Sequence, residues 1–406
     1  MRFEHPDHPG QSVHLAYCLN LHAASDLDGT LRGIREITLP LRDRLRSTGC
    51  FGVGLYLPAE VARGLAAPGG AAELERLAGE LEQEGLDPFT HNAFPYGGFH
   101  EDGLKRAVFA PAWFDPARLE FTLAVARIAA RLARGRGGLV SISTHPGRFG
   151  AFEGEELEQA TALFGRCLEG LAALSEEAGV RLRLAIEAEP RASSGDTREL
   201  QGFLEHLSGS LDPGLVEGHL GACLDACHSA VEFEEAGEVL DRGLRLPLGK
   251  LQVSSALALR HPGHHPEARA ALLALDEPRY LHQTTGRLPG GALLRVEDLP
   301  ELEAALATPG SEWLDCDEWR THFHVPFDLE ALGGLGTTRV HADGLVEALL
   351  GSPGRWGGDE LHLELETYTW DVLPGAARGA GGLVDGLERE YAPVLSSLAR
   401  AGWRPA

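Results

Sequence analysis

Basic residues are scarce in this chain of 406 residues. Its 36 Lys and Arg stand against 60 Asp and Glu, which gives a formal net charge of −24 at pH 7. A protein that binds nucleic acid needs a basic surface to contact phosphates, and the summed field of this chain would repel a polyanion. We therefore expect no nucleic-acid partner.

Long apolar runs are also missing. No stretch of eighteen apolar residues occurs, and the opening segment MRFEHPDHPGQS carries acids, histidines and prolines where a signal peptide would need an apolar segment. The six cysteines form no CxxC pair, which is typical of reduced thiols rather than of a disulfide framework or a zinc ribbon. We expect a cytoplasmic protein that does not insert into a membrane.

Short apolar runs alternate with longer amphipathic stretches about eight times along the chain. This alternation is typical of a parallel sheet built from strand–helix units. The expected strands cover residues 14–20, 51–57, 88–94, 139–145, 181–187, 221–227, 250–255 and 361–367. The expected helices cover residues 26–46, 71–84, 116–134, 155–178, 197–207, 233–243 and 383–401.

Eight such units favour an α/β fold of the (β/α)8 TIM-barrel type. A doubly wound dinucleotide-binding fold is disfavoured, because the first expected strand runs into CLNLH (Cys18 to His22) and not into a GxGxxG turn. The hydrophobic content of 43% is ordinary for a globular protein. We expect one TIM-barrel domain over residues 1–406.

About a hundred residues, Ala256 to Glu360, separate the seventh and eighth expected strands, and this is too long for a simple loop. We therefore expect an insertion or cap region over residues 257–360. It contains a hairpin pattern around Pro289-Gly290-Gly291 and a strand-like segment, WRTHFHVP, at 319–326. That segment either belongs to the insertion or is the true seventh strand in place of KLQVSS.

In a TIM barrel the active site lies at the C-terminal ends of the strands, so polar residues there are candidates. Glu187 and Glu189 end the fifth strand in IEAEP, and their spacing of two places both side chains on the same side. Burial of an unpaired carboxylate is costly. For Glu187 this favours a metal or an arginine partner over an exposed position at the rim.

The sixth and seventh strands add further candidates. Asp225 and His228, in CLDACHSA, are suitable ligands for a divalent ion, and the alternative is an Asx turn with a surface histidine. Gln252, in LQVSS, could offer a carbonyl oxygen to a cation, but a glutamine satisfied within the core fits equally well. Cys223 and Cys227 are interpreted as small fillers rather than as nucleophiles.

The eighth strand, LHLELETYTWDVLP, carries the strongest signal in the chain. His362, Glu364 and Glu366 share one face, and the leucines share the other. Acids that face the barrel axis favour a cation site over an ordinary core, with a polar edge strand as the alternative. Tyr368 and Trp370, just beyond, are candidate walls of a substrate pocket.

Two histidines in THFHVP, His322 and His324, also share a face. Beside carboxylates they favour metal binding about as well as they fit a pair of buried, hydrogen-bonded histidines. His145, at the end of the fourth strand, is a candidate proton carrier.

The loop after the third strand, HNAFPYGGFH, interleaves aromatics with glycines. Such a loop can form a movable pocket cover, although a merely packed long loop fits nearly as well. Its candidate substrate contacts are Asn92, Tyr96 and His100, and Glu189 is a further one.

The order Glu187, Asp225-x-x-His228, a Gln or His on strand seven, and Glu366 before Thr resembles the xylose isomerase-like barrels. The chain as a whole resembles the EboE family of that superfamily, which are called metabolite traffic proteins. The resemblance covers residues 16–374 and rests on AYCLN, NAFPYGGFH, SISTHP, CLDACHSAVEFE, KLQVSSAL, HFHVP and LETYTWDVLP.

The resemblance implies a divalent metal, Mn2+, Mg2+ or Zn2+, as cofactor. By the superfamily pattern its ligands would be Glu187, Asp225, Gln252 and Glu366, with His228 adjacent. The sugar enzymes commonly place a histidine on strand seven, where this chain has Gln252, and His324 is a candidate replacement. A small-molecule metabolite and a membrane-protein partner are also implied.

The first hypothesis is a metal-dependent isomerase or epimerase that acts on a small polyhydroxylated precursor, with Glu187 or Glu366 moving the proton. The alternative is a non-catalytic barrel that binds a metabolite and delivers it to a membrane partner. A phosphodiesterase related to endonuclease IV is disfavoured by the net charge of −24.

Overall fold

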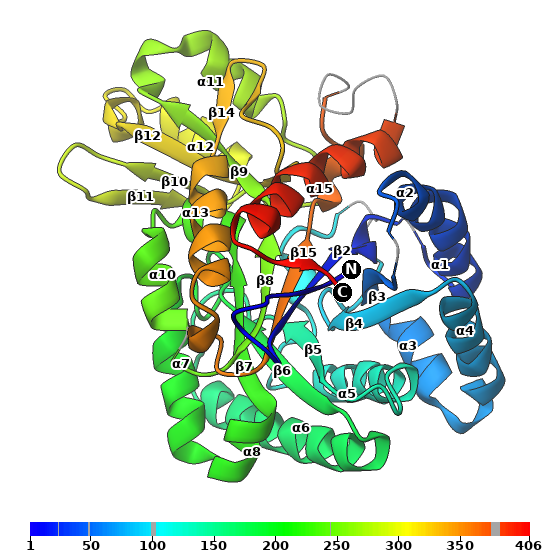
Figure 1. Ribbon diagram of the computed structural model, residues 1–406. Coiled ribbons are helices and arrows are strands. Elements are labelled where there is room, and N and C mark those ends of the chain that lie inside the picture. Colours follow the sequence, from blue (N-terminus) through cyan, green and yellow to red (C-terminus); the bar gives the residue numbers. More distant parts are fainter. Residues whose placement is uncertain (23, 48, 99–102, 244, 375–381) are drawn as a thin grey trace.

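A closed parallel barrel forms the body of the molecule in the computed structural model, which describes residues 1–406 except 23, 48, 99–102, 244 and 375–381 (Figure 1). The barrel closes because β15 (Glu360–Leu365) pairs with β2 (Ser12–Cys18) in parallel. Between them lie β3 (Phe51–Tyr56), β4 (Leu86–Asn92), β5 (Leu139–Thr144), β6 (Arg181–Glu187), β7 (Leu220–Asp225) and β8 (Leu248–Val253). The expected (β/α)8 fold is confirmed.

Helices lie between successive barrel strands in the sequence and cover the outer side of the barrel (Figure 1). Aspartates cap several of them; for example, Asp26 and Asp196 each accept a backbone N–H three residues ahead. The helices are α1 (Leu27–Gly33), α2 (Leu39–Arg44), α3 (Ala59–Ala66), α4 (Ala71–Gln83), α5 (Pro116–Leu132), α6 (Glu156–Ala178), α7 (Thr197–Ser210), α8 (Pro213–His219), α9 (Ala226–Val231), α10 (Ala236–Gly243), α13 (Arg339–Leu350) and α15 (Gly382–Arg400).

The barrel interior is polar at several levels. Near the amino ends of the strands, His362 contacts Ser141 Oγ through Nδ1 at 2.9 Å, and its ring packs on Phe89. One level higher, Lys250 forms an ion pair with Glu364, and both side chains are fully buried. Leucines 361, 363 and 365 of β15 point the other way, into the apolar layer under the helices. The expected division of β15 into a polar and an apolar face is confirmed.

A second sheet lies between β8 and β15 in the sequence, with the strand order β11-β10-β12-β9-β14-β13. It has its own apolar core, which includes Leu257, Trp313, Trp319 and Phe323. Its elements are β9 (Ser255–Arg260), α11 (Pro266–Leu273), β10 (Thr284–Arg287), β11 (Leu293–Val296), α12 (Leu299–Leu306), β12 (Glu318–Val325), β13 (Ala331–Leu332) and β14 (Leu335–Thr337).

The position of the seventh barrel strand is settled by these pairings. β8, which contains KLQV, pairs in parallel with β7 and β15, whereas β12 pairs antiparallel with β9 and β10 of the second sheet. The inserted sheet ends before α13, which contacts α10 and α15 in the helical layer of the barrel.

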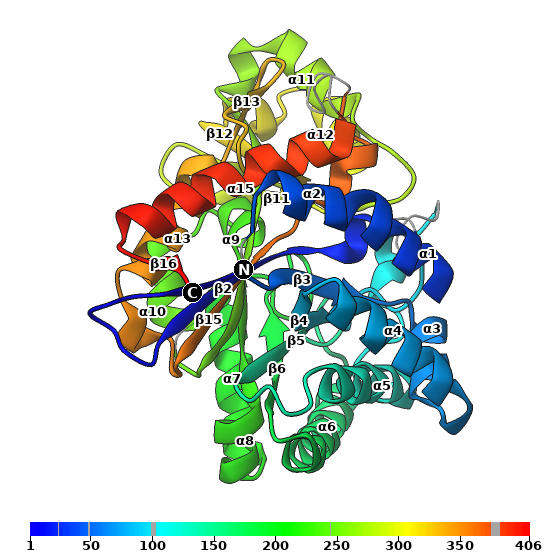
Figure 2. The ribbon, with the colours of Figure 1, turned by 45° about the vertical axis from the view of Figure 1, so that its right-hand side comes forward.

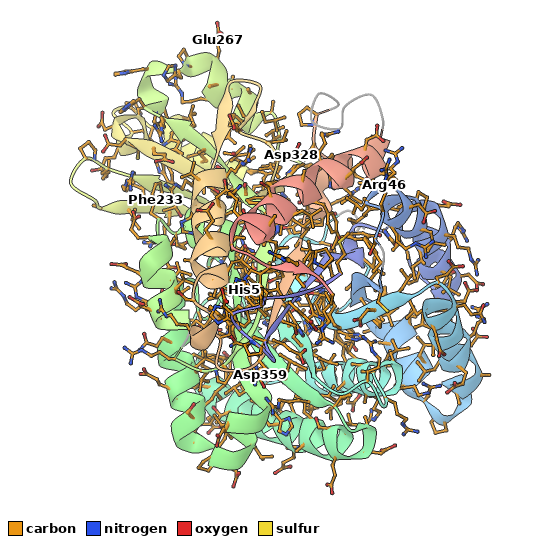
Figure 3. The ribbon with its side chains drawn as sticks, in the orientation of Figure 1. His5, Arg46, Phe233, Glu267, Asp328 and Asp359 are labelled. Atoms are coloured by element: carbon orange, nitrogen blue, oxygen red, sulfur yellow. The ribbon has the colours of Figure 1, made fainter. Side chains whose placement is uncertain are left out.

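The two termini lie side by side, since β1 (Arg2–Glu4) pairs antiparallel with both β2 and β16 (Arg404–Pro405) (Figure 2). The inserted sheet extends away from them. Glu267, on the helix α11 of the inserted region, lies at the tip of that region, and Asp359, just before β15, lies in the lower half of the barrel (Figure 3). In the part of the chain that the structure describes, no helix is long and apolar enough to cross a membrane.

Candidate metal centre and its pocket

A cavity of about 60 Å³ lies between the carboxyl ends of the barrel strands and the inserted sheet. The loop after β4 closes one side of it, because the backbone nitrogens of Gly103 and Lys105 donate to the oxygens of Pro278 and Arg279, each at 2.8 Å. Polar residues from the strand ends face apolar walls across this space. The apolar wall residues are Phe94, Val108, Phe109, Tyr280 and Leu281.

Three carboxylates converge beside this cavity, and we call them the carboxylate site: Glu187, Asp225 and Glu366. One oxygen of each lies within 4.8 Å of the other two, and all three side chains are buried. Glu187 ends β6, Asp225 ends β7, and Glu366 directly follows β15. Because parallel strands end at the same edge of the barrel, residues far apart in the sequence meet here.

Burial and repulsion among these carboxylates raise the pKa of Glu366. Burial raises this pKa well above its ordinary value, and the charges of Glu187, Glu364 and Asp225 raise it further. Three buried carboxylates at this spacing need a proton or a cation between them.

Asp225 provides a second sign of a missing partner. Its Oδ1 accepts the backbone N–H of His228 at 2.8 Å and so caps α9. Its Oδ2 is buried and has no hydrogen-bond partner among the described residues. The Asx cap considered from the sequence is therefore present, but His228 is buried rather than on the surface.

Glu366 is held by two amides. Asn20 donates to Oε1 through Nδ2 at 2.9 Å, and Gln252 donates to Oε2 through Nε2. The thiol of Cys223 donates to Oε1 of Gln252 at 2.8 Å. In this orientation Gln252 holds the carboxylate, and a ligand role for its oxygen would require the opposite amide orientation.

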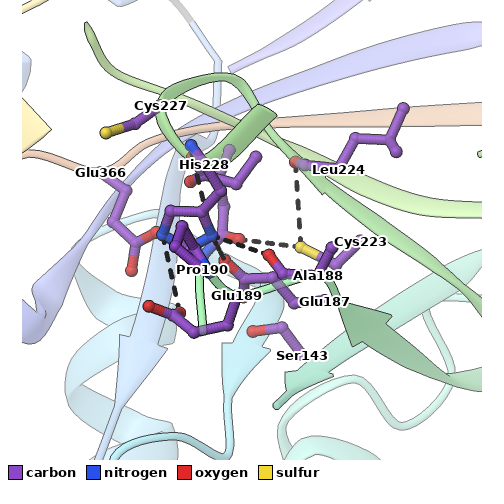
Figure 4. Close-up of polar contacts among 12 residues, drawn as sticks. Ser143, Glu187, Ala188, Glu189, Pro190, Cys223, Leu224, Cys227, His228 and Glu366 are labelled. Carbon is purple, nitrogen blue, oxygen red and sulfur yellow. Dashed lines mark hydrogen bonds and ion pairs between the residues drawn. The ribbon is translucent and has the colours of Figure 1, made fainter. Parts of the chain in front are cut away.

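The imidazole of His228 lies between two glutamates (Figure 4). Its Nδ1 is 3.2 Å from Oε1 of Glu187, and its Nε2 is 3.6 Å from Oε2 of Glu189. Burial lowers the pKa of His228, but the charges of Asp225, Glu189 and Glu187 outweigh it and raise the pKa well above its usual value. Burial also raises the pKa of Glu189 to about 8.

His322 and His324, at the end of β12, reach the same pocket from the inserted sheet. Their Nε2 atoms lie 2.9 Å apart and both contact Nε2 of His228. Tyr368 completes this side, with its hydroxyl 3.4 Å from Nε2 of His322.

Asn92 lines the cavity, but its side chain is already engaged in the barrel. Its Nδ2 donates to Glu364 Oε1 at 2.9 Å, and its Oδ1 accepts from Lys250 Nζ and Ser143 Oγ, each at 2.7 Å. These bonds fix the orientation of Asn92 at the cavity wall, and the expected substrate contact stays a prediction.

Three other candidates lie away from the cavity. Tyr96 packs on Phe121 of α5, and Trp370 packs against α15 at Gly386. His145 is buried behind Phe94 and Phe109, accepts from the backbone of Gly147 and has a pKa well below its usual value because of burial. None of the three lines the cavity, so the roles expected for them stay predictions from the sequence. His100 lies outside the described residues.

Two residues of the site, Asn20 and Lys250, were not predicted from the sequence. Asn20 follows β2 in CLNLH, and its position after a strand end was the available signal. Lys250 shares a parity with Gln252 on β8 and is one of only two lysines in the sequence, the other being Lys105. A lysine among inward-facing residues indicates a buried ion pair.

No protein-family model matches the sequence, and no curated protein matches it. Solved structures that resemble it include a zinc-bound IolI protein (11% identity, TM-score 0.43, covering 95% of this chain and 98% of that one). Another is D-psicose 3-epimerase in the presence of D-fructose (11% identity, TM-score 0.46, covering 95% of this chain and 98% of that one). A third is a xylose isomerase domain-containing protein from Salmonella typhimurium (10% identity, TM-score 0.42, covering 95% of this chain and 97% of that one). The likeness is weak, so the activity is inferred from the chain's own residues.

Proposed function

We propose that this protein is a metal-dependent isomerase or epimerase that acts on a small polyhydroxylated molecule. The observation that carries the proposal is the convergence of Glu187, Asp225 and Glu366 within 4.8 Å beside a cavity. Oδ2 of Asp225, which has no hydrogen-bond partner within the described part of the chain, fits a bound cation, since a carboxylate oxygen is a ligand of choice for hard divalent ions.

The ligands would be Glu187, Asp225 and Glu366, with Gln252 beside them. A divalent ion bound there supplies polarisation of adjacent substrate oxygens. Glu187 and Glu366 line the cavity and would move a proton between neighbouring carbons. Asn20 orients Glu366, His228 orients Glu187, and Glu189 with Tyr368 would contact the substrate.

The inserted sheet would act as the cap of this site. Its residues Tyr280, Leu281 and Gln283 line the cavity opposite the strand ends, and the loop after β4 is hydrogen-bonded to it. Both would exclude water from the reacting carbon atoms. Membership of the EboE family, a role in metabolite traffic and a membrane-protein partner stay predictions from the sequence resemblance.

The experiment that tests the activity is solvent isotope exchange. The Mn2+-loaded protein is incubated in D2O with ketoses, aldoses and inososes, and deuterium uptake at the carbon next to the carbonyl is followed by NMR. We expect uptake with at least one compound and its loss in Glu366→Gln. The control is Glu234→Gln, a buried glutamate outside the cavity that is paired with Arg242.

A bound ion and a bound ligand with no deuterium uptake from any compound would contradict the isomerase proposal. That result would favour the alternative, a barrel that binds a metabolite and delivers it to a partner.

A further inference from the structure

Three buried histidines, His228, His322 and His324, have ring nitrogens that are held by oxygen acceptors. Nδ1 of His228 donates to the backbone oxygen of Ala188 at 2.9 Å, and Nδ1 of His324 donates to that of Glu366 at 2.9 Å. A carbonyl oxygen can only accept, so both rings carry a proton on Nδ1.

Gln283 fixes His322 in the same tautomer. Its Nε2 donates to the backbone oxygen of Pro190 at 3.1 Å, which leaves Oε1 facing Nδ1 of His322 at 2.7 Å. Because an acceptor-only partner sets the amide orientation, Oε1 accepts and Nδ1 of His322 donates. With a proton on Nδ1, each ring in its neutral form carries a lone pair on Nε2. A cation at the three Nε2 atoms would take the place of the second proton that the surrounding carboxylates favour on His228.

These three lone pairs converge on one another. The Nε2 atoms lie 3.2 Å (His228 to His322), 3.1 Å (His228 to His324) and 2.9 Å (His322 to His324) apart. One additional proton can form a hydrogen bond between two of these nitrogens, whereas a metal cation can accept an electron pair from all three. Nitrogen bonds of about 2.0–2.1 Å place the ligand atoms roughly 3.3–3.4 Å apart around a tetrahedral ion and roughly 2.8–3.0 Å apart around an octahedral one. The observed separations fall within the interval that these two ranges together span.

We propose that His228, His322 and His324 form a second divalent-cation site, the histidine site, separate from the carboxylate site. Three neutral imidazoles favour a borderline ion such as Zn2+ or Co2+, whereas carboxylate oxygens favour Mg2+ or Mn2+. Glu189 would be a fourth ligand through Oε2, which lies 3.6 Å from Nε2 of His228, and would leave Oε1 for the substrate contact proposed above. None of the three nitrogens belongs to the carboxylate site, so the proposal stands independently of the isomerase activity.

Local irregularity in β12 directs both of its histidines into the pocket. The pairing of β12 with β9 shifts register between Thr321 and Val325, the segment that contains them. His282 donates to the backbone oxygen of His322 at 3.0 Å, and Thr369 donates to that of His324 at 2.6 Å. These bonds hold the backbone on both sides of the pair.

The carboxylate site and the histidine site are adjacent, and Asp225 and His228 lie between them. Asp225 has an oxygen within 4.8 Å of ligand atoms of both His228 and His324. Nδ1 of His228 faces the carboxylate site, and its Nε2 faces the histidine site.

The test compares Zn2+ and Mn2+ affinities of metal-free full-length protein by chelator competition, with Co2+ absorption as a report of imidazole ligands. In His322→Gln we expect Zn2+ affinity to fall on the order of 100-fold or more and the Co2+ bands to be lost, while Mn2+ affinity is unchanged. In Glu366→Gln we expect Mn2+ affinity to fall, while Zn2+ affinity and the Co2+ bands are unchanged. His91→Gln, a buried histidine outside the pocket, controls for packing.

The proposal is overturned if the wild-type protein binds no Zn2+ or Co2+, or if His322→Gln binds Zn2+ as tightly as the wild type. It is also overturned if Glu366→Gln loses both ions together, because the residues would then form one site. Loss of Zn2+ alone in His322→Gln, with Mn2+ absent from the wild type, would support the histidine site and remove the basis of the isomerase proposal. If His322→Gln does not fold, Gln283→Leu serves as the second variant.

Discussion

Nδ1 of His228 lies 3.2 Å from Oε1 of Glu187, and this contact determines what the imidazole can do. With Nδ1 turned to the carboxylate, Nε2 points to His322 and His324 at 3.2 and 3.1 Å. One histidine thus orients a residue of the carboxylate site and contributes a nitrogen to the histidine site. The sequence motif Asp225-x-x-His228 places it there, because Asp225 caps the short helix that carries it.

Gln283 should act as a positioning residue for the histidine site. Replacing it with leucine removes the acceptor of His322 Nδ1 and frees the ring to rotate or change tautomer. We expect Zn2+ affinity to fall about 10–100-fold, as is usual when a metal-binding histidine loses its hydrogen-bond partner. Chelator competition measures this, and Gln283→Glu should restore most of the affinity. Equal affinity in Gln283→Leu and the wild type would contradict the assigned tautomer.

Lys250 should be essential for stability through Glu364. Both side chains are fully buried, and Lys250→Met would leave the Glu364 carboxylate without its cation. Breaking such a pair typically costs about 3–5 kcal/mol, whereas replacing both partners costs much less. Urea unfolding should therefore show that Lys250→Met combined with Glu364→Leu recovers at least half of the stability lost in the single variant. A double variant as unstable as the single one would show that the pair is not the cause.

Gly54 should tolerate no side chain. It lies on β3 inside the barrel, where a Cβ atom would overlap Oε1 of Glu364. Overpacking of this kind costs about 1–3 kcal/mol, so Gly54→Ala should lower the free energy of unfolding by that amount. Gly64→Ala is the control, because a Cβ on that helix residue meets no atom within 4 Å and should stabilise α3 by roughly 0.5–1 kcal/mol. Equal effects of the two substitutions would contradict the packing around Glu364.

Stability should fall as the pH drops below about 6.5, because His91 is buried in its neutral form. Burial lowers the pKa of His91 to about 3, against an ordinary value of 6.5. Between these values the unfolded chain binds a proton that the folded chain does not, so stability decreases with decreasing pH by about 1.4 kcal/mol per unit for each such histidine. His14, with a pKa lowered to about 3 by burial, adds to the effect.

His91→Gln isolates this contribution. Between about pH 6.5 and pH 5 the variant should lose roughly 2 kcal/mol less stability than the wild type in urea unfolding. Parallel stability curves for the two proteins would contradict a neutral His91 in the folded state.

Much of the barrel could be predicted from the sequence, because buried parallel strands form short apolar runs bounded by glycine and proline. Strand β6, for example, covers Arg181–Glu187, the range expected from the sequence. The single helix expected over 26–46 is instead divided by a π-helical turn at Ile34–Thr38. The placement of β12 could not be predicted, since it depends on antiparallel pairing with β9 about sixty residues earlier.

The convergence of the carboxylates was predictable for the same reason, since strand ends meet at one edge of a barrel. The orientation of Gln252 and the engagement of Asn92 were not, because both follow from hydrogen bonds to residues on other strands. Hydrogen-bond networks of this kind leave no periodic signal in a sequence.

The most direct test of the account is the metal content of the purified protein after dialysis against Mn2+ and removal of free ion. We predict one Mn2+ per chain in the wild type, loss of that ion in Glu366→Gln and its retention in Glu234→Gln. Wild-type protein that is folded but retains no Mn2+, or a Glu366→Gln variant with a full complement of Mn2+, would contradict the carboxylate site as the metal centre.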